Sequence, residues 1–234
     1  MLYQVKLHLK YLITKTNLIL FIILAITLSL FFIFSSNIIT DFNERWMDRD
    51  NLKQSYMEIM KNTLKVILPL ISIFLFGNSF LSYQDNYILL FHETRKIRIS
   101  FFITKWISIC LVMIVIFIFT IFQYAFWGLI SLPTFMVKDI EIEYWVKLFA
   151  ISIIYSLLSI IIVTICNHSL GYIAIIIFYI LLNAIFEINE ALLNVLAWVF
   201  PLLTDKTCSI SYLLFLLVVY FYVAFIIYYK QNRS

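Results

Sequence analysis

Six long runs of apolar residues alternate with shorter polar segments along the 234-residue chain. The runs cover about residues 18–36, 64–82, 106–128, 145–165, 171–188 and 210–229. Each run is close to the ~20 residues that an α-helix needs to cross ~30 Å of hydrocarbon. The pattern therefore predicts an all-α, polytopic integral membrane protein, with six transmembrane helices in a single domain that covers residues 1–234.

Three segments outside these runs also carry a pattern. In residues 2–15, apolar positions recur at helical spacing beside lysines, which predicts an interfacial helix that binds membrane lipid. A plain basic flank that sets orientation is the alternative. Residues 37–63 contain no Gly or Pro and have charges of both signs, so we expect them to extend the flanking helices. Residues 191–203 are apolar but too short to span, and Pro201 interrupts them, which favours a pair of short re-entrant or surface-lying helices on the outer side between spans five and six.

The composition indicates that lipid surrounds most of the chain. Hydrophobic residues make up 64% and charged residues 13% of the sequence, whereas a soluble domain has about 25% charged residues. The three glycines and three prolines exclude long flexible linkers and glycine-rich phosphate loops. The net charge of +4 is spread over the loops, so we expect no nucleic-acid partner.

Basic residues give the orientation. Lysines precede the first run, and four basic residues lie in the segment 92–105 between the second and third runs. Overall, nine basic residues fall on the side of the N-terminus and eight on the other side. We predict a multi-pass protein with both termini in the cytoplasm. The richness in Ile, Phe, Tyr, Lys and Asn is typical of an AT-rich bacterial genome, so we place the protein in a bacterial cell membrane.

Residues that could carry out catalysis are few and far apart. Cys110, Cys166 and Cys208 have no CxxC spacing, and the three histidines are widely separated. The sequence has no HExxH, paired-glutamate, GxS or P-loop motif. We therefore predict no catalytic residue and no metal or cofactor site. An intramembrane enzyme is a rival class that lacks its recognisable motifs.

Polar residues within the predicted spans are the candidates for a translocation path or gate. They are Gln123, Ser156, Asn183 and Glu187. Gln123 and Asn183 are unfavourable against lipid, so we expect them to face other helices or a path. Ser152, Ser156 and Ser159 recur at i, i+4 and i+7, which also fits close helix packing. Glu187 comes near the end of the fifth run, which favours an outer gate over a proton relay.

The segment 83–100 is the notable hydrophilic stretch on the predicted inner side. As a short helix held against the membrane, it would present polar side chains to a cytoplasmic partner. These are Gln84, Asp85, Glu93, Arg95 and Lys96. A solvated basic loop that faces lipid explains the same residues, and their chemistry alone does not decide between the two.

This layout resembles the membrane-spanning subunits of type-two ABC exporters. In that family an interfacial helix precedes span one, and a coupling helix joins spans two and three. A tight inner turn joins spans four and five, and short re-entrant helices precede span six. The chain is similar in all four respects, with residues 166–170 as the tight turn. The family's acid, leucine stretch, Ser/Thr-Arg pair and lysine resemble Asp85, Leu89–Leu90, Thr94–Arg95 and Lys105. The family's glycine after the acid and proline before the Ser-Arg pair are absent.

The resemblance implies a permease subunit whose energy comes from a separate ATP-binding ABC subunit docked on residues 83–100. It also implies a second copy or a similar permease subunit as a partner. The short outer loops and apolar spans favour a hydrophobic or amphipathic substrate, with a peptide such as a bacteriocin as the best fit. The alternative is an immunity or sensor protein that binds a peptide in the membrane without any ATPase.

Overall fold

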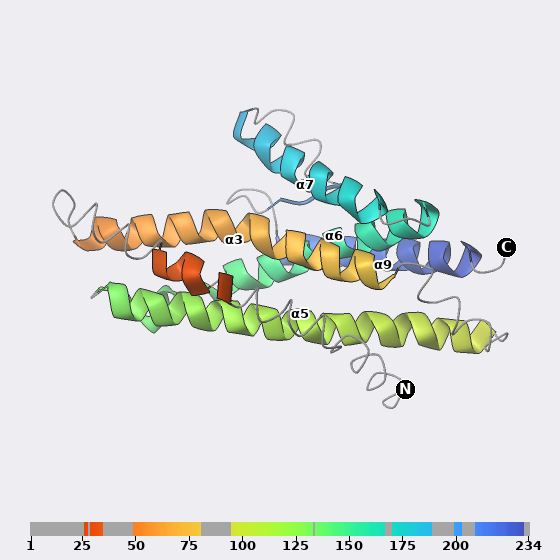
Figure 1. The fold of residues 1–234 in the computed structure, drawn as a ribbon, viewed down its shortest axis with the longest axis horizontal. Coiled ribbons are helices and arrows are strands. Elements are labelled where there is room, and N and C mark those ends of the chain that lie inside the picture. The colour runs from red at the N-terminus through yellow and green to blue at the C-terminus, as the bar shows by residue number, and fades with distance from the viewer. Residues whose placement is uncertain are drawn as a thin grey trace.

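The structure is a computed structural model that describes residues 26–27, 29–34, 49–80, 95–132, 134–166, 170–188, 199–202 and 209–231. Its elements are α3 (Arg49–Ser79), α5 (Arg95–Ser131), the 3-10 helix η1 (Val137–Asp139), α6 (Ile142–Cys166), α7 (Leu170–Ile188) and α9 (Ile210–Gln231) (Figure 1). Residues 26–27 and 29–34 are also helical. The predicted all-α class is therefore confirmed for the described part of the chain.

Four helices are long and apolar enough to cross a membrane. They cover Leu52–Ser79, Ile99–Ser131, Ile142–Cys166 and Ile210–Lys230. The fifth predicted span corresponds to α7, whose described apolar stretch, Leu170–Ile185, is shorter. The first predicted span lies largely outside the described residues. By helix length and hydropathy the chain is a multi-pass membrane protein, and four of its six predicted spans are shown.

Successive helices run in opposite directions, so the bundle has two distinct ends (Figure 1). At one end, which we call the η1 end, α3 begins, α5 ends and α6 begins beside η1. At the other, the turn end, α5 begins and α6 passes into α7. The ring of Phe80, just after α3, lies 5.9 Å from that of Tyr228 near the end of α9, which places the end of α9 at the turn end.

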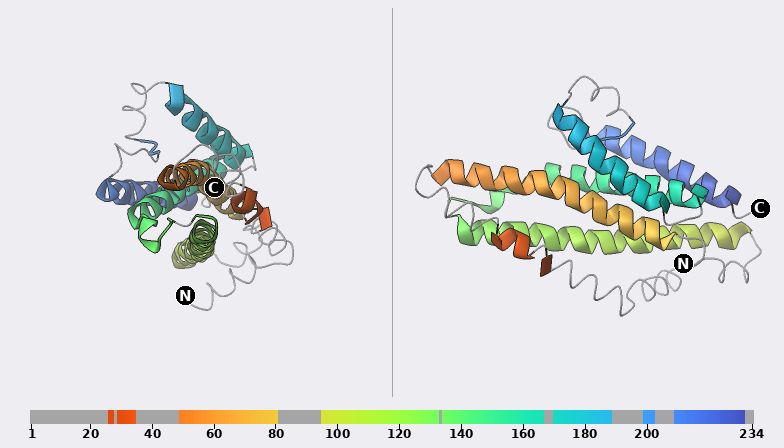
Figure 2. Two further views of the ribbon diagram at one scale, coloured as in Figure 1. Left: turned by 90° about the vertical axis from the view of Figure 1, so that its left-hand side faces the viewer. Right: turned by 45° about the horizontal axis from the view of Figure 1, so that its top comes forward.

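Helix α6 is the centre of the bundle. It packs against α3, α7 and α9, and every residue from 150 to 161 is buried. Helix α5 packs instead against α3 and α9, and Figure 2 shows it as a separate layer beside the other helices. The middle of α6 therefore meets protein on all sides, whereas much of α5 faces outward.

Two helices extend beyond the predicted spans. Helix α3 begins at Arg49, which confirms the expected helical extension for residues 49–63. The extension is amphipathic because Leu52, Tyr56 and Met60 recur every four residues and are buried. Helix α5 begins at Arg95. The last residues of the segment 83–100 are therefore continuous with the third span rather than part of a separate short helix.

The connection between α6 and α7 is short, as predicted, because α6 ends at Cys166 and α7 begins at Leu170. The two helices lie very close there. A Cβ atom on Gly171 would lie 2.9 Å from the Cα atom of Val163, so only glycine fits this approach.

The predicted re-entrant segment is described at residues 199–202. The hydroxyl group of Tyr220 donates a 2.8 Å hydrogen bond to the carbonyl oxygen of Val199. Tyr220 lies about 15 Å along α9 from its first residue, at 1.5 Å per residue. The ring of Phe200 packs 4.9 Å from that of Phe178 on α7. Residues 199–202 therefore contact both α7 and α9, and the prediction of short re-entrant helices stays a prediction. The predicted interfacial helix at residues 2–15 lies outside the described residues.

Candidate functional site

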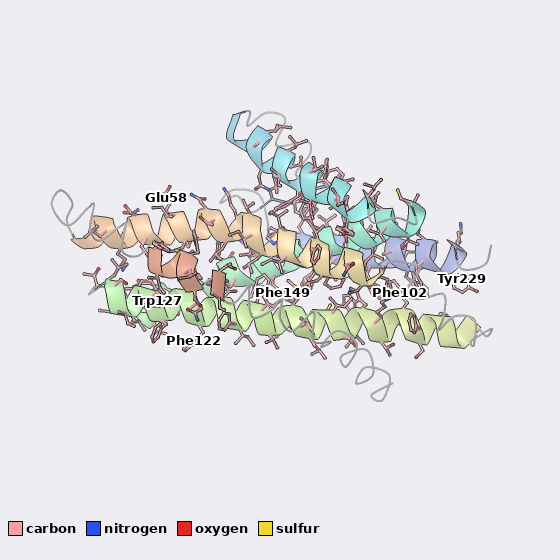
Figure 3. All side chains as sticks on the ribbon, in the orientation of Figure 1. Glu58, Phe102, Phe122, Trp127, Phe149 and Tyr229 are labelled. Atoms are coloured by element: carbon pink, nitrogen blue, oxygen red, sulfur yellow. The ribbon has the colours of Figure 1, made fainter. Side chains whose placement is uncertain are left out.

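An apolar groove lies between α5 and α6 near the η1 end. Its volume is about 310 Å³ and its lining includes Ile114, Phe117 and Ile121 of α5 and Trp145 and Phe149 of α6. All of its lining side chains are apolar, so the groove can hold an alkyl or aromatic group and offers no acid, base or nucleophile. Figure 3 labels Phe149 between α6 and α5.

Large rings, rather than close backbone contact, connect α5 to α6. Phe117 meets Phe149 edge-on at 5.1 Å between ring centroids, and Tyr124 meets Trp145 at 5.6 Å. The hydroxyl oxygen of Tyr124 is buried and has no hydrogen-bond partner in the structure, although its backbone carbonyl accepts a bond from Tyr56. The groove is thus bordered by aromatic side chains that keep the two helices apart.

Two ion pairs connect α3 to residues 139–141 at the η1 end. The ammonium nitrogen of Lys53 lies 3.0 Å from Oδ1 of Asp139, and that of Lys61 lies 2.6 Å from Oε1 of Glu141. Oδ2 of Asp139 also accepts a 2.7 Å hydrogen bond from the backbone N–H of Met136. This backbone hydrogen bond, and secondly Lys53 and Lys138, hold the pKa of Asp139 below its ordinary value of 3.8. The ion pairs tie the extension of α3 to the segment between α5 and α6.

Replacing Asp139 with asparagine should weaken the η1 end in a pH-dependent way. Folding lowers the pKa of Asp139, so the ionised carboxylate stabilises the folded state at every pH above the pKa of the unfolded chain, about 3.9. This stabilisation is lost as the pH falls through the lower pKa of the folded state. We expect Asp139→Asn to lower the Tm by about 2–4 °C at about pH 7 and by much less near about pH 3. Thermal unfolding in detergent at both pH values measures this.

Glu143→Gln is the matched control for this prediction. Glu143 is 68% exposed and pairs with Lys147 one turn along the same helix, so the pair contributes little. An Asp139→Asn variant with the same Tm loss at both pH values would show that the charge of Asp139 has no part in the stability of this end.

The three predicted path residues whose side chains are described, Gln123, Ser156 and Asn183, lie on three different helices. The amide oxygen of Gln123 accepts a 2.9 Å hydrogen bond from the indole N–H of Trp127 on the same helix. Ser156 is fully buried and donates to a carbonyl group one turn earlier on α6. Asn183 likewise donates to a carbonyl group one turn earlier on α7. Each of these three polar groups is therefore paired within its own helix.

The remaining predicted site residues are described in part or not at all. Gln84, Asp85 and Glu93 lie outside the described residues. Arg95 and Lys96 form the first turn of α5, and only their backbone is described. Glu187 lies in the last turn of α7, likewise without a described side chain. The coupling role of Gln84, Asp85, Glu93, Arg95 and Lys96 stays a prediction. So does the gate role of Glu187.

The serine series on α6 lies at the contact with α3. Ser152, Ser156 and Ser159 have no exposed surface. The hydroxyl group of Ser159 donates to the carbonyl oxygen of Ile73 at 3.2 Å, and that of Ser72 donates to the carbonyl oxygen of Ser152 at 2.8 Å. Small hydroxyl side chains let the two helices approach and hydrogen-bond in lipid, which supports the packing interpretation of the series.

The structure adds a polar contact that the sequence reasoning missed. Pro69 lies inside α3 and has no N–H, so the carbonyl oxygen of Lys65 lacks its usual helical donor. The hydroxyl group of Tyr179 on α7 donates to that oxygen at 2.6 Å. The available signal was the proline in the middle of an apolar run, because a freed carbonyl group in a membrane needs a donor from another helix.

Function has to be inferred from these features of the chain itself. Comparison with known protein families, with curated proteins and with solved structures gives no match. Among the described residues, no three His, Cys, Asp or Glu side chains lie close enough together to hold a metal ion. The groove beside α5, with the ion pairs above it, is the candidate site.

Proposed function

We propose that this chain is the membrane-spanning permease subunit of an ATP-driven exporter, with ATP hydrolysis in a separate subunit. The observation that carries the proposal is the continuity of α5, which runs for 37 residues from Arg95 to Ser131. At 1.5 Å per residue it is about 55 Å long, well beyond the ~30 Å of hydrocarbon. One rigid helix thus joins the predicted coupling segment to the groove, because the α5 side of the groove lies on residues 114–121.

The packing of α5 allows it to act as a lever. Helix α5 approaches α3 and α9, but rings and the groove separate it from the central helix α6. A rigid-body tilt of α5 therefore disturbs few close helix contacts and changes the width of the groove directly. A displacement of α5 at Arg95 would therefore move the α5 side of the groove, where an apolar group of the substrate can lie.

The charges at the start of α5 favour an acidic partner. Arg95, Lys96 and Arg98 occupy the first turn, and no acid lies there. A helix N-terminus carries a partial positive charge, so cations at this place are unfavourable until anionic groups oppose them. An acidic surface on an ATP-binding subunit supplies such groups, and it would dock where the resemblance to type-two ABC exporters places the coupling helix.

The energetic scheme is alternating access. Nucleotide binds more tightly to the closed form of the ATPase pair, and this difference in affinity drives the movement of α5. A second copy or a similar permease subunit completes the path, because one bundle supplies only one wall of it. The substrate class that fits a wholly apolar groove beneath charged side chains is an amphipathic molecule, with a peptide favoured.

Affinity purification tests the proposal. The tagged protein is isolated from its native host in mild detergent, with and without crosslinking, and its partners are identified by mass spectrometry. We expect an ATP-binding subunit in near-equal amount. Recovery of the chain alone after crosslinking would overturn the exporter proposal and favour the ATPase-independent immunity or sensor protein.

Charge reversal tests the coupling segment itself. We expect Asp85→Lys combined with Arg95→Glu to reduce substrate-coupled ATP hydrolysis by the purified complex at least ~10-fold, because a charged contact between two subunits would become repulsive. The amount of protein in the membrane should not change. Reversal of the exposed Lys138 at the η1 end is the control. Unchanged coupling in the double variant would exclude residues 83–100 as the docking site.

A further inference from the structure

Helix α3 has a built-in weak point near the start of its apolar part. Pro69 lies within the stretch Leu52–Ser79 that is apolar enough to cross the membrane. A proline removes one helical hydrogen bond, and its ring crowds the carbonyl group four residues earlier, so helices bend at such positions. The carbonyl oxygen of Lys65 lies at the edge of the apolar run 64–82, where α3 packs against α7. With its helical donor missing, this oxygen can be satisfied by a hydroxyl group from α7.

Tyr179 on α7 is that donor. Its hydroxyl group lies 2.6 Å from the carbonyl oxygen of Lys65, and its side chain is 1% exposed. Its ring packs against that of Tyr155 on α6, with 4.5 Å between centroids at an angle of 70°. The contact with Tyr155 fixes the direction of the ring and keeps the hydroxyl group aimed at α3.

Helix α6 contacts α3 on the C-terminal side of Pro69. The hydroxyl group of Ser72 lies 2.8 Å from the carbonyl oxygen of Pro69 and 2.8 Å from that of Ser152. Its single proton is therefore shared between the bent helix and the central helix. Helix α7 thus contributes a hydroxyl donor to α3 on the N-terminal side of Pro69, and α6 contributes a carbonyl acceptor on its C-terminal side.

The hydrogen bond from Tyr179 also helps to set the tilt of α7 relative to α3. At the turn end, Gly77 of α3 lies directly against Tyr172 of α7. Towards the η1 end, α7 leans away from α3 (Figure 1). Phe178, next to Tyr179, packs against Phe200 in the segment 199–202. A change in the tilt of α7 would therefore move residues 199–202 as well.

We propose that the hydrogen bond from Tyr179 to the carbonyl oxygen of Lys65 is a hinge contact that couples the bend of α3 at Pro69 to the tilt of α7. Tyr179 acts as a positioning residue in this hinge. It completes the hydrogen bonding of α3 only while α7 holds its present tilt, so the two helices move together. The segment 199–202 follows α7. This inference stands independently of the transport proposal.

A double-mutant cycle on Tyr179→Phe and Pro69→Ala tests the hinge. Removing the hydroxyl group leaves the Lys65 oxygen without a donor, so Tyr179→Phe should lower the Tm by roughly 3–8 °C. In the Pro69→Ala background the alanine N–H supplies a donor, so the same change should lower the Tm by less than half as much. Equal shifts in both backgrounds would show that Tyr179 only packs, and would overturn the inference.

Tyr172→Phe is the matched control, since it removes a tyrosine hydroxyl from the same helix and should give equal shifts in both backgrounds. A distance measurement between spin labels at Glu58 on α3 and Ile185 on α7, both exposed, provides a second readout. We expect Tyr179→Phe, but not Tyr172→Phe, to broaden and lengthen this distance. An unchanged distance in Tyr179→Phe would overturn the coupling of the two helices.

Discussion

An alanine in place of Gly77 is expected to force α3 and α7 apart. A Cβ atom at this position would lie 2.3 Å from the Cβ atom of Tyr172 and 3.1 Å from the hydroxyl oxygen of Ser159. The first distance is far inside van der Waals contact. The Cβ atom of Tyr172 is fixed to the backbone of α7, so no rotamer change relieves the clash. The whole helix has to move.

The expected loss of stability is large for one methyl group. Overpacking costs roughly 1–3 kcal/mol where side chains can adjust. Here α7 must shift, which also breaks the hydrogen bond from Tyr179 to α3, so we expect a loss of about 3–5 kcal/mol. Thermal unfolding in detergent, with the fraction of monodisperse protein from gel filtration, measures it.

Gly128→Ala is the control for this prediction. A Cβ atom on Gly128 would also be crowded, at 2.9 Å, but the atoms it meets belong to the ring of Phe135. That ring is a side chain on the connection between α5 and η1, packed against Tyr56 and Tyr124. It can be displaced without moving a helix, so we expect a smaller loss of about 1–2 kcal/mol. Equal stability of the two alanine variants would contradict the close approach of α3 to α7.

Leu157→Ala is expected to have the second large effect. Leu157 lies in the middle of α6 and has no exposed surface. Its truncation leaves a cavity between packed helices, and the expected loss is about 2–5 kcal/mol. Val218→Ala on α9 is the comparison, because Val218 is 64% exposed and lipid can fill the space that the valine vacates. We expect its effect to stay within ~0.5 kcal/mol.

Reversible unfolding of both variants in mixed micelles measures these losses. The comparison tests the central position of α6 directly, since the two residues lie in helices with the same mean hydropathy. Similar losses for Leu157→Ala and Val218→Ala would mean that α6 is no more enclosed than α9. Because Leu157 is buried and Val218 is exposed, the loss of stability should be several-fold larger for Leu157→Ala.

The proposed movements lie on opposite faces of a fixed core. Helix α6 is enclosed and forms hydrogen bonds with α3 through Ser72 and Ser159. On one face, the groove separates α6 from α5. On another, the hinge at Pro69 connects α3 to α7. In the alternating-access scheme proposed above, both movements would occur beside a central helix that keeps its position.

The apolar runs predict the helices best where hydrocarbon alone sets their length. The fourth and sixth predicted spans, at residues 145–165 and 210–229, correspond to α6 at Ile142–Cys166 and α9 at Ile210–Gln231. Helices α3 and α5 are longer than their runs because polar helical turns continue beyond the hydrocarbon. For α3 the four-residue spacing of Leu52, Tyr56 and Met60 carried that signal.

The candidate site was harder to predict than the helices. Polar residues in the spans are the residues that a sequence marks as a possible path, yet Gln123, Ser156 and Asn183 each form a hydrogen bond within their own helix. The groove is lined by residues such as Ile114 and Phe149, which have the same chemistry as side chains that face lipid. An apolar site in an apolar sequence carries no distinguishing pattern.

The amino-acid pattern thus establishes a helical membrane protein and the segments that form its helices, because a polypeptide backbone in hydrocarbon must satisfy its own hydrogen bonds. It does not establish which helix lies at the centre. The most apolar windows of α6 and α9 have the same mean hydropathy, but 72% of the first is buried and 22% of the second. Lipid chains are as apolar as a protein interior, so both surroundings select the same residues. The position of α6, the groove beside it and the contact of Tyr179 with α3 follow from helix packing, which depends on the shapes of side chains and on donors contributed by distant segments.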